Sequence, residues 1–265
     1  MRGAAQSQPS EGQMSRIEWP SLARVLAWTL AITFIAGTIA LLLVALNVLG
    51  TPPEPKGDFP DRIVADFEFQ QSQWPIVFGG TALYAIGFLA TGGLGPVLAR
   101  LADPDDARRG LVSAAFLSAG GLGAAAQLIQ IGATPVATDP HYCDCGLLAE
   151  ELMSRLMAFN IVMGIQTWLV SGAIVAAAVG LIAAGGLGQD AGMPSGWRWL
   201  SLAIAVLFLI ASVMPLFAVS PFDLLMIALT AGILLPIWAI WLALRARDVW
   251  PELEPDSVVV FEPSP

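Results

Sequence analysis

The chain has 265 residues and a formal net charge of -9; 56% of its residues are hydrophobic and only 12% are charged. A soluble domain carries about 45 to 50% apolar and about 25% charged residues, so this chain has too little charge to cover its apolar surface in water. The negative charge argues against a nucleic-acid partner, which would need a basic face. The counts exclude a soluble globule and predict a protein whose main partner is the lipid bilayer.

Six stretches are long and apolar enough to cross a membrane, since a helix needs about 20 residues to span roughly 30 Å of hydrocarbon. Their length and the lack of strict alternation favour helices over barrel strands. In chain order they cover about residues 21–50, 75–99, 110–134, 156–185, 197–219 and 221–244. The predicted fold is an all-α, polytopic transmembrane helix bundle of six spans over residues 19–250, with disordered tails at residues 1–18 and 251–265.

Local patterns predict several details of these helices. Asp103 followed by Pro104 is typical of the cap and first residue of the third helix. Pro215 and Pro236 lie within spans and predict kinks. Three tryptophans are expected in the aromatic belt at the membrane surface, namely Trp197, Trp199 and Trp250. Small residues, among them Gly120, Gly121, Gly123, Gly172 and Gly180, predict close packing between the third and fourth helices.

Basic residues divide unevenly between the two sides of the predicted bundle. Nine arginines fall on the side of both termini, whereas Lys56, Arg62 and Arg155 fall on the other. The positive-inside rule therefore predicts that both termini are cytoplasmic and that the protein is a multi-pass protein of the inner (plasma) membrane. The preference for arginine over lysine, together with the high Ala and Gly content, favours a bacterial source.

Most familiar chemistries lack the residues that they need. No ionisable side chain is expected at mid-membrane, where pumps and proton-coupled carriers keep them. His141 is the sole histidine, and the chain has no HExxH, GxSxG or Walker motif. The sequence therefore predicts a protein that is not an enzyme and has no cofactor.

One cluster in the second outer loop holds His141, Cys143 and Cys145. An imidazole and two thiolates could bind a soft metal such as copper or zinc. On an oxidising outer face the two cysteines could instead form a disulfide, and the loop could also contact a partner. The sequence leaves these alternatives open.

Four amide side chains lie in the outer half of the third and fourth spans: Gln127, Gln130, Asn160 and Gln166. An amide in hydrocarbon needs a partner, so hydrogen bonds between the two helices are the simpler interpretation. The alternative is a small pocket, open to the outer face, whose amides bind a polar ligand. These four residues are the candidate ligand-binding site.

The layout resembles a family of uncharacterised bacterial six-helix integral membrane proteins, known only as a domain of unknown function. The resemblance rests on the segment from Gly87 to Arg100, which runs into the turn Asp-Pro-Asp-Asp-Ala-Arg-Arg, and on the segment from Trp238 to Arg245 that ends the last helix. It implies the fold and no activity.

Three functions are compatible with this sequence. The absence of polar chemistry in the core favours an accessory or scaffold subunit that binds another membrane subunit or forms a homo-oligomer. A passive channel or small-solute carrier would use the four amides. An outer-face metal or redox sensor would use His141, Cys143 and Cys145.

Overall fold

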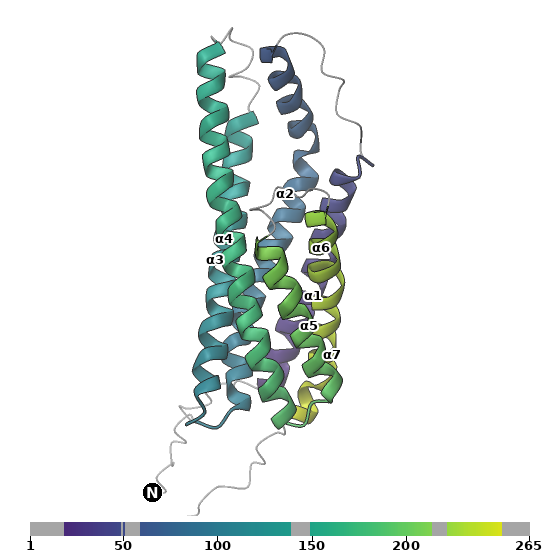
Figure 1. Ribbon diagram of the computed structural model, residues 1–265. Helices are drawn as coiled ribbons and strands as arrows, with labels where there is room; N and C mark the ends of the chain where they lie inside the picture. The colour runs from purple at the N-terminus through teal and green to yellow at the C-terminus, as the bar shows by residue number, and fades with distance from the viewer. Residues whose placement is uncertain (1–18, 49, 51–58, 139–148, 214–221, 251–265) are drawn as a thin grey trace, which may run out of the picture.

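The structure, a computed structural model, describes residues 19–48, 50, 59–138, 149–213 and 222–250 (Figure 1). Regular secondary structure in these ranges is entirely helical. The elements in chain order are α1 (Trp19–Ala45), α2 (Phe59–Leu98), a 3-10 turn η1 (Ala99–Leu101), α3 (Ala107–Thr138), α4 (Ala149–Asp190), α5 (Ser195–Val213), α6 (Phe222–Leu229), a π-turn η4 (Thr230–Leu234) and α7 (Leu235–Val249).

The predicted all-α fold is confirmed for the residues that the structure describes. Six helices are long and apolar enough to cross a membrane, and the sixth consists of η4 and α7 in direct succession. In the most apolar stretch of each helix, about a third to two thirds is buried inside the protein, and the rest lies on the surface. Such helices are compatible with an integral membrane protein, because their exposed apolar faces need lipid around them.

Two helices are much longer than a bilayer requires. Helix α2 has 40 residues and α4 has 42, which corresponds to about 60 Å at 1.5 Å per residue. Figure 1 shows α2, α3 and α4 continuing beyond the ends of α5 and α6. By contrast, α1 ends at Ala45, short of the predicted residue 50, because the chain turns there and Asn47 adopts a φ of 54°.

From α1 to α5, helices that follow one another in the chain lie side by side, and α1 also packs against α7, which closes the bundle (Figure 1). The guanidinium of Arg100, after α2, lies 4.8 Å from the ring centre of Trp19, where α1 begins. This end of the bundle also carries Arg108, Arg198 and Arg245, and we call it the arginine-rich end. Helix α1 begins and helix α7 ends at this end of the bundle (Figure 1).

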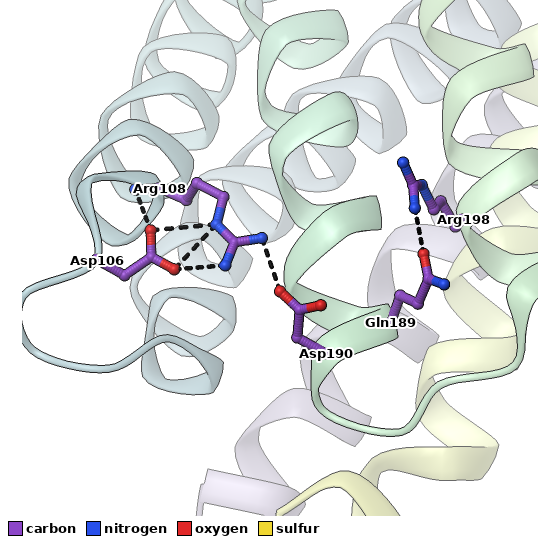
Figure 2. Close-up of polar contacts among 5 residues, drawn as sticks. All are labelled: Asp106, Arg108, Gln189, Asp190 and Arg198. Carbon is purple, nitrogen blue, oxygen red and sulfur yellow. Dashed lines mark hydrogen bonds and ion pairs between the residues drawn. The ribbon is translucent and has the colours of Figure 1, made fainter.

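Ion pairs join the connecting turns at the arginine-rich end (Figure 2). Asp106 caps α3, because its Oδ1 accepts a hydrogen bond of 2.8 Å from the backbone N–H of Arg108. The cap predicted at Asp103 is therefore wrong: Asp103 and Pro104 form a turn before the helix, and the backbone N–H of Asp106 donates to the Asp103 carbonyl at 3.0 Å. Arg108 also reaches Asp190 at the end of α4, at 2.7 Å, while Arg198 donates to Gln189.

Two of the expected packing details differ in the structure. Helices α3 and α4 do pack together, with Gly180 against the Phe116 ring, but Gly120 and Gly123 face Gly92 and Phe88 of α2 instead. Trp197 and Trp250 are 0% and 8% exposed and belong to the buried core, so their predicted place in the aromatic belt is wrong, whereas Trp199 is 70% exposed. A helix whose sequence is apolar all round has no periodic pattern that would indicate which of its faces lies inside the bundle.

The continuous helix formed by α6, η4 and α7 changes its geometry near its middle. Thr230 begins the π-turn η4, and Pro236 lies at the start of α7 directly after it. A proline lacks the N–H that an α-helix needs, and a local widening of the helix accommodates this loss. Pro215, the other predicted kink, lies outside the described residues.

Candidate functional site

A cavity of about 240 Å³ lies at the centre of the bundle. Its walls come from α1 through α7, including η4, and most of the lining is aromatic or aliphatic. Small-molecule sites in proteins are typically concave and mostly apolar, with a few polar groups that orient the ligand. The polar groups of this cavity therefore determine what it could bind.

Three of the four predicted amides line this cavity: Gln127 and Gln130 on α3, and Gln166 on α4. Gln127 is buried, and the other two are partly buried. Within the described ranges, no hydrogen bond links any of these three side-chain amides to another protein group. The structure thus brings the three amides to one space without the interhelical hydrogen bonds that the simpler interpretation predicted.

Asn160 does not belong to this group. It is exposed on α4 and is absent from the cavity wall. The reason is geometric, since the offset of six residues from Asn160 to Gln166 corresponds to a rotation of about 600°, which leaves the two side chains about 120° apart around the helix axis. The distance along the helix axis placed both residues in the outer half, but it does not indicate toward which side of the helix each side chain points.

The structure adds a polar residue to the site that the sequence analysis missed. Thr230 is 0% exposed, lines the cavity, and its Oγ1 has no hydrogen-bond partner among the described residues. A threonine in an α-helix usually donates to the carbonyl three or four residues before it, as Thr91 does to Gly87 at 2.9 Å. No feature of the sequence around Thr230 indicates that its hydroxyl lacks such a partner.

Two further hydroxyls of the cavity region bind each other. Thr38 Oγ1 and Tyr84 Oη lie 2.7 Å apart, in a buried contact between α1 and α2. The Phe34 ring packs edge-on against Tyr84 with 5.2 Å between ring centres. This pair is satisfied within the protein and fixes the wall of the cavity beside η4, where Gly232 approaches Thr38 closely.

Among the residues that the structure describes, the cavity wall carries no carboxylate, guanidinium, ammonium or imidazole group. A charged ligand would lose its hydration on entering the cavity and would find no opposite charge among these residues. Its transfer from water would therefore cost free energy. The electrostatics of the site therefore favour an uncharged ligand that can form hydrogen bonds.

The predicted metal-binding residues His141, Cys143 and Cys145 lie outside the described residues. Elsewhere, the part of the chain that the structure describes has no group of three His, Cys, Asp or Glu residues that could hold a metal ion. The structure therefore leaves the choice between metal, disulfide and partner contact where the sequence left it.

Comparisons of the chain with protein-family models, with curated proteins and with solved structures find no match. The arguments about function therefore rest on the residues and the geometry of this chain.

Proposed function

We propose that this is a multi-pass membrane protein that binds a small uncharged molecule in its central cavity, as a solute carrier or passive channel would. The observation that carries the proposal is the set of three amides, from two helices, that share a cavity without a hydrogen-bond partner among the described residues. A primary amide offers two donors and one acceptor group, so three of them can recognise an uncharged polar group in several orientations.

The energetics of burial support a ligand at this place. A polar group left without a hydrogen bond in an apolar interior costs about 1 to 3 kcal/mol. Ordered water can reduce this cost, and a ligand that hydrogen-bonds to the amides removes it while filling the apolar remainder of the space. The cavity therefore gains more from an amphipathic molecule than from an entirely apolar one.

Native mass spectrometry of protein extracted from its own membrane in lipid discs tests the proposal. We expect a bound small molecule in the wild type and its loss, by more than tenfold, in a triple variant with Gln127→Leu, Gln130→Leu and Gln166→Leu. Leucine has a similar size and no hydrogen-bonding group. Asn160→Leu is the matched control, because this amide lies on α4 outside the cavity.

Two results would contradict the proposal. In the first, the triple variant remains folded and carries the same molecule as the wild type; in the second, neither protein carries any molecule. Equal loss in the triple variant and in Asn160→Leu would show that the effect does not come from the cavity.

The topology and the location belong to the same proposal. The charge distribution supports cytoplasmic termini and insertion in the inner (plasma) membrane of a bacterium. The start of α1 and the end of α7 lie at the same end of the bundle in Figure 1, which is consistent with an even number of crossings. With this orientation, Gln130 and Gln166 are the amides nearest to the outer side.

A second candidate function, an accessory subunit, is favoured by one face of α4. Met157, Ile161, Ile165 and Trp168 are exposed at spacings of three and four residues, which places them on one side of the helix. Met157 lies 33 residues from Asp190, about 50 Å along the axis and beyond the roughly 30 Å that lipid tails cover. An apolar face at that height would be covered by another subunit.

Extraction of native membranes into polymer discs, followed by native electrophoresis, tests this second function. We expect the wild type to migrate as a complex and the double variant Met157→Ser, Ile161→Ser to migrate as a monomer. The control is Ile182→Ser on the same helix, close to the arginine-rich end and within the lipid-covered length. A monomeric wild type would contradict the accessory role.

A further inference from the structure

The polar groups that lack a partner lie toward one end of the cavity, where apolar residues such as Leu41 and Met226 also line it. On α3, Gln127 and Gln130 lie 11 and 14 residues beyond Phe116, which places them about 16 and 21 Å further from the arginine-rich end. On α4, Gln166 lies about 22 Å beyond Leu181 by the same measure. Phe116 and Leu181 therefore line the apolar end of the cavity, and the amides line its other end.

Thr230 belongs to the polar half. It lies about 7 Å beyond Leu235 along the sixth helix, and the adjacent Gly232 approaches Thr38, which contacts Tyr84. The π-turn η4 packs against α1 and α5, whereas the amides come from α3 and α4. The unpartnered hydroxyl therefore lies on a different wall from the amides, and a polar group between these walls could bind both.

The hydroxyl of Thr91, nearer to the apolar end, does not add a polar group there. It donates to the Gly87 carbonyl of its own helix at 2.9 Å. The other residues that line this end, among them Phe88, Phe116 and Leu181, are apolar. A hydrocarbon chain is the molecular part that fits such a surface.

We propose that the cavity binds a single-chain amphiphile with an uncharged headgroup, whose headgroup lies between the three amides and Thr230 and whose chain points toward Phe116 and Leu181. This inference rests on the proposed function and names the class of its ligand. The described residues of the wall carry no charged group, which selects against fatty acids and alkylamines. The buried hydroxyl without a partner gives the headgroup a second point of attachment.

The test uses the full chain in lipid discs and four probes, with the bound fraction measured by native mass spectrometry. The probes are 1-monooctanoylglycerol, octanoate, octylammonium and glycerol. We expect the monoglyceride to bind once per protein chain, both charged probes to bind at least tenfold more weakly, and glycerol to bind least because it lacks the chain.

Two single substitutions test the role of Thr230. Thr230→Val keeps the shape of the side chain and removes the hydroxyl, so we expect the monoglyceride to bind about tenfold more weakly, and Thr230→Ser should restore most of the affinity. Thr167→Val is the matched control. Its hydroxyl donates to the Met163 carbonyl of its own helix at 2.9 Å and it does not line the cavity, so affinity should not change.

The inference is overturned if octanoate or octylammonium binds as tightly as the monoglyceride, if the monoglyceride does not bind, or if Thr230→Val binds like the wild type. It is also overturned if glycerol binds as well as the monoglyceride and requires the three glutamines, although the proposed function then stands. If the monoglyceride does not bind and the native protein carries no molecule, both fail.

Discussion

Trp197 and Trp238 stack inside the bundle with 5.1 Å between their ring centres. The indole N–H of Trp197 donates to the Trp238 carbonyl at 3.3 Å, and the indole N–H of Trp238 donates to Ser201 Oγ at 2.8 Å. The two rings thus join α5 to α7 in a region where these helices have few other contacts. Each of the two indole N–H groups has a partner, as buried polar groups require.

The first prediction concerns this junction. Ser201→Ala leaves the N–H of Trp238 buried without an acceptor, so the free energy of unfolding should decrease by about 1 to 3 kcal/mol. Equilibrium unfolding in mixed micelles, followed by tryptophan fluorescence, measures the change. Ser212→Ala is the control on the same helix, because its hydroxyl binds only the local Leu209 carbonyl. Equal effects of the two substitutions would refute the special role of Ser201.

The second prediction concerns Asp106 and pH. The side-chain N–H groups of Arg108, and then its backbone N–H, hold the pKa of Asp106 below its usual value of 3.8. A lowered pKa in the folded state stabilises the protein above the unfolded-state value, and this contribution is lost as pH falls through the folded-state pKa. The thermal midpoint of the wild type should therefore decrease below about pH 4 relative to that of Asp106→Asn.

Thermal unfolding of both proteins between about pH 7 and pH 3 measures this difference. The effect should be small, since the group is on the surface, and it should decrease further at high salt. A constant difference between the two proteins over the whole range would show that Asp106 does not contribute in this way.

The third prediction compares two adjacent glycines of α3. A Cβ at Gly120 would lie 2.6 Å from the Cα of Gly92, whereas a Cβ at Gly121 would meet nothing within 4 Å. Gly120→Ala must move the backbone of α2 or α3, so it should lower the free energy of unfolding by about 1 to 3 kcal/mol. Gly121→Ala should leave it unchanged or raise it. Steric trapping in lipid measures both, and the reverse order would refute the close α2–α3 contact.

The fourth prediction concerns topology. Reporter proteins that are active in only one compartment, fused before residue 19 and after residue 250, should both report from the cytoplasm. A fusion in the loop between α3 and α4 should report from the opposite side. If the two terminal fusions reported from different compartments, the assignment of inner and outer faces would be wrong, but the packing of the six helices would be unaffected.

Part of the candidate site could be predicted from the sequence. Gln127 and Gln130 are three residues apart, so helical geometry alone put them on one face. Gln166 was included correctly because amides are rare and costly in apolar helices, but Asn160 was included by depth although it faces away. Thr230 was missed, because a threonine within an apolar helix usually satisfies its own hydroxyl and only the contacts at η4 show otherwise.

Composition and hydrophobic length determined the all-α fold and the six helices long enough to span a membrane, because a chain with so little charge has few other stable arrangements in lipid. The tertiary structure decided which face of each helix is inside. A helix that is apolar all round carries no periodic mark of its neighbours, so the inward turn of Trp197, the contact of Gly120 with α2 and the cavity beside Thr230 follow from how the helices fit together.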